Sequence, residues 1–137
     1  MVRKECYEMI RKAVLDKGLA KHVDMWNENV AFMDEDAAWE RPAVFVEFGE
    51  ITWTSMKGVG LRSYRGKGEI RLHIVTDFYD GGMERGFEIA GEIAGMLPGM
   101  RGVGFDGIEL ISSLTNHNHE EILELVDVYG CNYLLTL

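Results

Sequence analysis

Two stretches of alternating apolar and polar residues dominate the middle of the chain, between residues 41 and 78. The apolar positions are Val44, Val46 and Phe48 in the first stretch and Ile70, Leu72 and Ile74 in the second. A period of two is typical of a half-buried strand. Both stretches are also rich in β-branched and aromatic residues, which suit a pleated sheet. The pattern predicts a long β-hairpin with a polar, basic tip at residues 55–67.

The first arm of this hairpin contains an irregularity. If Val46 faces the core, strict alternation places Ile51 and Trp53 outside. One extra residue near Gly49 returns both to the core, so we expect a β-bulge there. Before the bulge, paired residues have numbers with an even sum, as in Val46 with Ile74, because a slip of one residue exchanges the two faces.

Helical spacing marks two further segments, residues 2–17 and 83–97, which end at Gly18 and at Pro98-Gly99. Their apolar stripes are Cys6, Ile10, Ala13 and Val14 in the first and Phe87, Ala90, Ile93, Ala94 and Leu97 in the second. The remaining pattern predicts a short edge strand at Val23 and Met25 and a strand at 107–113. A turn at 115–121 and a last strand at 122–135 complete the chain.

This order predicts an α+β fold in a single domain, residues 1–137. We expect a mostly antiparallel sheet of four to five strands, with two helices packed on one face. Phe45 and Val75 fall on the other face. Because an exposed apolar patch usually marks an interface, we expect another subunit to cover them.

Composition adds limits on partners and location. The 137 residues carry a formal net charge of −9, which argues against general affinity for nucleic acid or anionic membranes. No apolar run approaches the roughly 20 residues of a membrane span, and the N-terminus has no apolar signal core. Cys6 and Cys131 are far apart in sequence and are expected to be buried thiols in a reducing compartment. The protein is therefore expected to be intracellular or to be assembled inside a cell.

The hairpin tip concentrates positive charge in an acidic chain. Its expected partner-binding residues are Lys57, Arg62, Tyr64, Arg65 and Lys67. The spacing of Gly60, Gly66 and Lys67 does not match a phosphate-binding loop, which also opens a helix instead of joining strands. The tip is therefore either a plain solvated loop or a docking element for an acidic partner or nucleic acid.

Two other groups of charged or titratable residues each allow two functional interpretations. Glu84, Glu88 and Glu92 share one helix face, which is either solvated or an acidic strip that receives the basic tip of a neighbour. His117 and His119, beside Glu120 and Glu121, resemble part of a metal site. Zinc needs three or four ligands and the spacing supplies no third, so we expect an exposed turn and neither a metal nor a cofactor.

Several segments together resemble a known group of proteins. They are residues 23–30, 41–48, 68–77 and 115–121. In element order they are similar to small prophage-encoded proteins of the phage tail-terminator and tail-completion group. The resemblance covers most of the chain and implies an α+β subunit that forms a homo-oligomeric ring, usually a hexamer. Such a ring caps the tail tube and joins it to the head.

The resemblance also implies partners and a location. The partners are tail-tube and head-connector proteins, without a membrane and without sequence-specific nucleic acid. The protein would lie in the bacterial host cytoplasm during assembly and in the virion afterwards. It implies no enzyme activity and no catalytic residue. The alternative hypothesis is a small-molecule-binding or enzymatic α+β domain with His73, Asp77, His117 and His119 around a pocket. A pocket with a strongly shifted titratable group favours this alternative, and a large apolar sheet face favours the assembly protein.

Overall fold

The structure, a computed structural model, describes residues 1–27, 39–58, 62–119 and 121–137, without the side chains of residues 117–119. The elements in chain order are α1 (Val2–Asp16), β1 (His22–Met25), β2 (Ala43–Met56), β3 (Ser63–Asp77), α2 (Gly82–Met96), the short 3-10 helix η1 (Leu97–Gly99), β4 (Phe105–His119) and β5 (Ile122–Thr136). The strands form one five-stranded sheet in the order β1-β2-β3-β5-β4. Only β1 and β2 pair in parallel among these strands. The predicted α+β class, the long hairpin and the edge strand β1 are confirmed.

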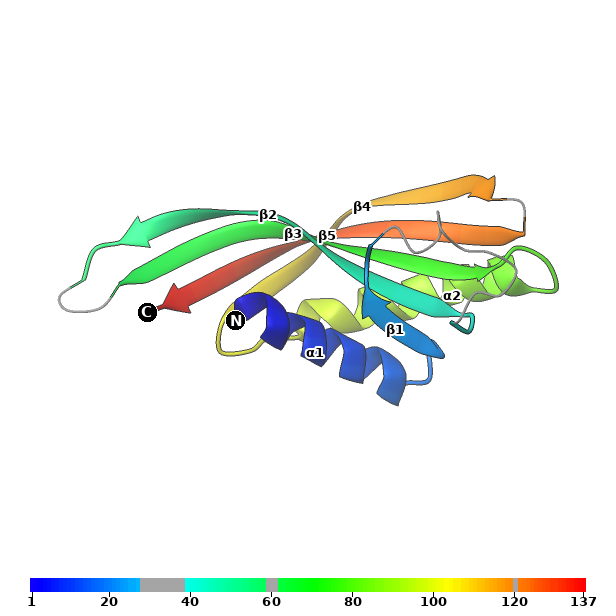
Figure 1. The fold of residues 1–137 in the computed structure, drawn as a ribbon, viewed down its shortest axis with the longest axis horizontal. Coiled ribbons are helices and arrows are strands. Elements are labelled where there is room, and N and C mark those ends of the chain that lie inside the picture. Colours follow the sequence, from blue (N-terminus) through cyan, green and yellow to red (C-terminus); the bar gives the residue numbers. More distant parts are fainter. Residues whose placement is uncertain (28–38, 59–61, 120) are drawn as a thin grey trace.

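The helices α1 and α2 lie on the same face of the sheet, as Figure 1 shows. We call this the helix face and the opposite one the outer face. The strands β2, β3 and β5 continue well past the helices (Figure 1). The helices therefore cover one end of the sheet and leave the other end as a bare three-stranded extension.

The hairpin confirms the predicted bulge and face assignment but changes the register. Pairing between β2 and β3 shifts between Phe48 and Ile51, where the extra residue was expected. Val46 lies opposite Leu72 and not opposite Ile74. The sum of the paired numbers stays even, so the faces are as predicted. The strands are simply offset by two residues, which preserves the side-chain pattern.

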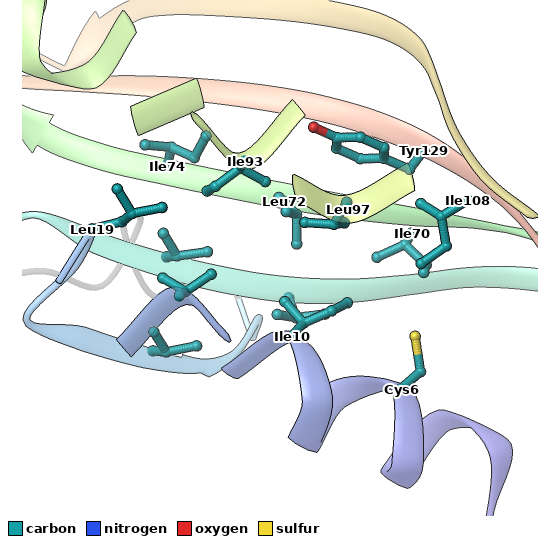
Figure 2. Close-up of a cluster of buried hydrophobic side chains, with 14 of the residues drawn as sticks. Cys6, Ile10, Leu19, Ile70, Leu72, Ile74, Ile93, Leu97, Ile108 and Tyr129 are labelled. Atoms are coloured by element: carbon teal, nitrogen blue, oxygen red, sulfur yellow. The ribbon is translucent and has the colours of Figure 1, made fainter. Parts of the chain in front are cut away.

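The core lies between the helix face and the two helices. Figure 2 shows Cys6 and Ile10 of α1, Ile93 of α2 and Leu97 of η1 directed toward side chains of the sheet. All four of these residues are fully buried. Burial of apolar area on this scale is the main stabilising contribution to such a fold.

The predicted stripe of α2 is confirmed for Ile93 and Leu97, which are fully buried, and is wrong for Phe87. Phe87 is 48% exposed, while Gly86, Ile89 and Ile93 are buried. A Cβ atom built on Gly86 would lie 3.0 Å from the hydroxyl oxygen of Thr76. The missing side chain lets the helix approach the sheet closely, and this contact turns Phe87 toward solvent.

The strand β4 is much longer than predicted. It extends to His119 and pairs with β5, with Thr115 opposite Leu125 and Asn116 opposite Glu124. The expected turn at residues 115–121 is therefore wrong as far as residue 119, and Glu120 lies outside the described residues. A long partner strand overrides the turn preference of Asn and His, because strand formation depends mainly on cross-strand pairing.

The outer face is not the bare apolar surface that was expected. Phe45 and Val75 are both fully buried. They form a small cluster with Ala43 and Ile122, against which Trp26 and Trp39 pack. Trp39 meets the Phe45 ring edge-on, with a 5.1 Å distance between ring centroids. The chain thus covers this patch itself.

Candidate interaction surface

The bare extension of the sheet carries most of the predicted tip residues. We call this extension the arm and define it by Thr52–Met56 of β2, Ser63–Lys67 of β3 and Asn132–Thr136 of β5. In it β3 pairs with β2 on one side and with β5 on the other. The tip expected at residues 55–67 is therefore mostly paired strand, and residues 59–61 lie outside the described residues. The basic side chains stand on a hydrogen-bonded platform instead of a loose loop.

Aromatic side chains stiffen the arm on its helix face. A Cβ atom on Gly66 would lie 2.8 Å from the Trp53 ring, so the indole lies flat over the glycine. Trp53 also lies near Tyr133, with 6.3 Å between ring centroids. Such aromatic pairs across strands are worth roughly 0.5–1.5 kcal/mol beyond burial of area. They help to explain how a segment without helices above it holds its shape.

The predicted tip residues divide between the two faces of the arm. Tyr64 is half-buried on the helix face, because it alternates with Arg65 along β3. Arg65 and Lys67 are exposed on the outer face, opposite Thr54 and Thr52. Lys57 and Arg62 are exposed at the end of the arm. The structure brings Arg65 and Lys67 together on one surface and leaves Tyr64 on the other.

A groove of about 890 Å³ runs along the outer face of the arm. Arg65 and Lys67 line it, together with the apolar side chains of Met56, Val103 and Leu134. Val103 is 92% exposed and Leu134 is 44% exposed. One carboxylate, Asp106, also borders the groove. The surface is therefore amphipathic, with two cations beside exposed apolar groups. Such a surface suits a partner with an apolar anchor and acidic neighbours.

The cations of the arm have no acidic partner in the part of the chain that the structure describes. No ion pair within 4.0 Å involves Lys57, Arg62, Arg65 or Lys67. Some other described cations do pair, as Arg71 does with Glu47 and Glu69. Because Arg65 and Lys67 lie two residues apart on one face, they repel each other until an anion approaches.

The predicted acidic strip lies on the solvent side of α2. Glu84, Glu88 and Glu92 are all exposed. Glu88 pairs with Arg85 at 3.4 Å and Glu92 lies 4.0 Å from the Lys17 amino group. Exposed pairs of this kind contribute roughly 0–1 kcal/mol each and exchange readily for a competing partner. The exposed Phe87 is an apolar feature in this strip that the sequence pattern had assigned to the core.

The outer face also contains a buried polar cluster that the sequence did not predict. His73 is 6% exposed and lies between two carboxylates. Its Nδ1 atom is 2.9 Å from Glu124 Oε2 and its Nε2 atom is 2.7 Å from Glu47 Oε1. The Trp26 ring stacks on the imidazole at 3.7 Å, with a 3° angle between the planes. Each ring nitrogen is therefore within hydrogen-bonding distance of a carboxylate oxygen.

This cluster changes the alternative hypothesis of a pocket around His73. Asp77 is exposed and pairs with Arg41, so the partners of His73 are glutamates of neighbouring strands instead. The side chains of His117 and His119 lie outside the described residues. Within the described part of the chain, no group of three or more His, Cys, Asp and Glu residues is placed to hold a metal ion. His73 lies opposite Phe45 of β2 and opposite Val126 of β5. Glu47 and Glu124 lie two residues from these partners on the same face of the sheet. Only the strand register, and not the sequence pattern, brings the two glutamates to His73.

Four groups with a shifted pKa, Cys6, Tyr129, Cys131 and Tyr133, lie in the core between the helices and the sheet. A hydrogen bond with Cys131, followed by burial, raises the pKa of the Cys6 thiol. The structure thus brings together two buried, free cysteines that the sequence had left apart. Burial also raises the pKa of Tyr129 and of Tyr133. The shifts of the two tyrosines reflect exclusion of water from the packed core, and that of Cys6 reflects first of all its contact with Cys131.

None of the helices in the described residues is long and apolar enough to cross a membrane.

No model of a known protein family matches the chain, and no curated protein matches its sequence. Among solved structures, the chain is similar to one from "Virion of native gene transfer agent (GTA) particle". The superposition covers 95% of this chain and 92% of that one, with a TM-score of 0.54 and 12% sequence identity. At this identity the likeness establishes a shared fold.

Proposed function

We propose that this chain is a structural subunit of a phage-like particle and that it has no enzymatic role. The observation that carries the proposal is the fold shared, over nearly the whole of both chains, with a chain of a gene transfer agent virion. The resemblance of the sequence to tail-terminator and tail-completion proteins points in the same direction.

Within such a particle, the proposed role is a ring subunit that caps the tail tube and joins it to the head. The proposed partners are further copies of this chain, six in a hexameric ring, together with tail-tube and head-connector proteins. The arm supports this role because it presents Lys57, Arg62, Arg65 and Lys67 beyond the helix-covered body. A platform with cations on it and apolar groups beside them suits docking onto another protein. The chain would act in the bacterial cytoplasm during assembly and remain in the virion.

Two experiments test this proposal. The first deletes the gene in the bacterium that carries it and examines the particles by electron microscopy. We expect separate heads and tails, or tails of abnormal length, and rescue by a plasmid-borne copy. Complete, joined particles in the deletion strain would exclude the role. The second measures the mass of the purified full chain by light scattering and expects a discrete multiple of the 15.5 kDa subunit.

A further inference from the structure

No described residue of the same chain fills the groove on the outer face of the arm. The helices lie on the opposite face of the sheet, and the arm extends past them (Figure 1). The α2 helix of the same molecule therefore cannot reach the groove. An apolar groove that carries Arg65 and Lys67 without acidic partners among the described residues is poorly matched to water alone. A second molecule is therefore a candidate to fill it.

The solvent side of α2 has the complementary chemistry. Phe87 projects from it with 48% of its surface exposed. Glu84 lies three residues before it on the same side of the helix, and Glu88 follows it in sequence and pairs with Arg85; both glutamates are exposed. An aromatic side chain flanked by carboxylates is the counterpart of a groove in which apolar walls alternate with cations. Aromatic anchors in such pockets commonly dominate the affinity of protein interfaces.

The shapes of the two surfaces also correspond. One turn along α2 from Phe87, Gly91 and Gly95 leave a shallow, open depression of about 520 Å³, which Lys17, Glu88 and Glu92 border. No described atom lies within 4 Å of a Cβ built on either glycine. On the arm, Val103 stands out at the border of the groove and is 92% exposed. Each surface therefore offers one projecting apolar group and one hollow.

We infer that the arm groove of one subunit binds the solvent side of α2 of a second copy, with Phe87 seated beside Met56 and Leu134. In this contact Glu84 and Glu88 face Arg65 and Lys67 of the neighbour. The groove and the helix are different surfaces of one chain, so the contact is heterologous and repeats from copy to copy. A heterologous contact closes into a ring when its rotation allows. The inference rests on the proposed ring and names the surfaces that build it.

Variants of the full-length chain test this contact by mass measurement across a dilution series. Phe87→Ala is expected to raise the concentration for half-assembly by at least ~30-fold, as expected for loss of an interface anchor. Leu114→Ala is the matched control, because Leu114 is also an exposed apolar residue, at 61%, but lies on β4 away from both surfaces. The control should assemble like the parent chain. Circular dichroism and urea unfolding should show that both variants fold normally.

Charge reversal tests whether the cations of the arm pair with the carboxylates of α2 on a neighbouring copy. Arg65→Glu with Lys67→Glu should abolish assembly, and so should Glu84→Arg with Glu88→Arg. All four changes in one chain should restore assembly, because the charges are exchanged and the pairing is kept. A mixture of the arm variant with Phe87→Ala should yield dimers and no rings, since each variant retains one intact surface. These results would not be expected from a contact made by two identical patches.

Three results would overturn the inference. The first is a parent chain that stays monomeric at every concentration. The second is loss of assembly in Leu114→Ala with normal assembly in Phe87→Ala, which would place the contact at β4. The third is intact rings in all these variants with loss of particle joining, which would assign the groove to another virion protein. The gene deletion reports on the proposed function separately, because its readout is the particle and not the mass of the purified chain.

Discussion

The buried cluster around His73 allows a stringent test of the energetics of the outer face. His73 joins Glu47 on β2 and Glu124 on β5 across the middle strand of the three. The side chains of His73 and Glu124 are only 8% and 6% exposed, whereas that of Glu47 is 30% exposed. Replacing His73 by Leu keeps the volume roughly constant and removes the partner of a buried carboxylate. The perturbation is therefore electrostatic more than steric.

Removal of one partner from a buried ion pair costs about 3–5 kcal/mol. Two features place His73→Leu near the lower end of that range. Asn116 still donates a hydrogen bond to Glu124 Oε1 at 3.0 Å. Glu47 remains close to Arg71, 3.6 Å away, and is partly solvated. Since domains of this kind are stable by roughly 5–15 kcal/mol, the variant should still fold at room temperature with a clearly lower urea midpoint.

The double variant His73→Leu with Glu124→Leu is the decisive control. Replacing both members of a buried pair by apolar residues is often neutral or stabilising. The cross-strand neighbours of these positions are Phe45 and Val126 for His73 and Val75 and Asn116 for Glu124, so three of the four neighbours are apolar. We expect the double variant within ~1 kcal/mol of the parent chain, which corresponds to a coupling energy of roughly 2–3 kcal/mol between the sites. Urea unfolding followed by circular dichroism measures all four corners of the cycle. Additive costs, with the double variant least stable, would refute the reasoning.

Three further predictions concern the helix α2 and the core beneath it. Ile93→Ala should lower stability by about 2–5 kcal/mol because Ile93 is fully buried, whereas exposed Phe87→Ala should stay within ~0.5 kcal/mol of the parent chain in urea unfolding. Gly86→Val should cost roughly 1–3 kcal/mol through overpacking, while Gly91→Ala, with open space around its Cβ, should stabilise by about 0.5–1 kcal/mol. Burial, followed by the charge of Asp127, raises the pKa of Tyr129 above its ordinary value of 10.0. Its contribution to stability is thus fully present below pH 10 and is lost as the pH rises further, because the unfolded chain ionises first. Tyr129→Phe should flatten this alkaline loss in unfolding experiments and should not itself destabilise, since the hydroxyl has no hydrogen-bond partner among the described residues.

Local patterns were enough to predict most of the elements of this fold. Alternation in the two central stretches predicted β2, β3 and the bulge between Phe48 and Ile51. Helical spacing predicted α1 and α2 within one or two residues at each end. These features depend on neighbours in sequence, because a strand repeats its faces every two residues and a helix every 3.6. The cationic residues of the tip were also evident, since charge is a property of composition.

Other features depended on which segments meet in space. Phe45 and Val75 were expected to need a partner subunit, yet Trp26 and Trp39 of the same chain cover them. Phe87 fits the apolar stripe of α2, but the close approach of Gly86 to Thr76 turns it outward.

The same holds for pairings between strands. Strand register places His73 beside Glu124, which is 51 residues away in the sequence. Helix packing places the Cys6 thiol beside that of Cys131, near the other end of the chain. Period and composition determine which face a residue can take. Only the tertiary arrangement determines what lies opposite that face, because contact between distant segments depends on the packing of the whole chain.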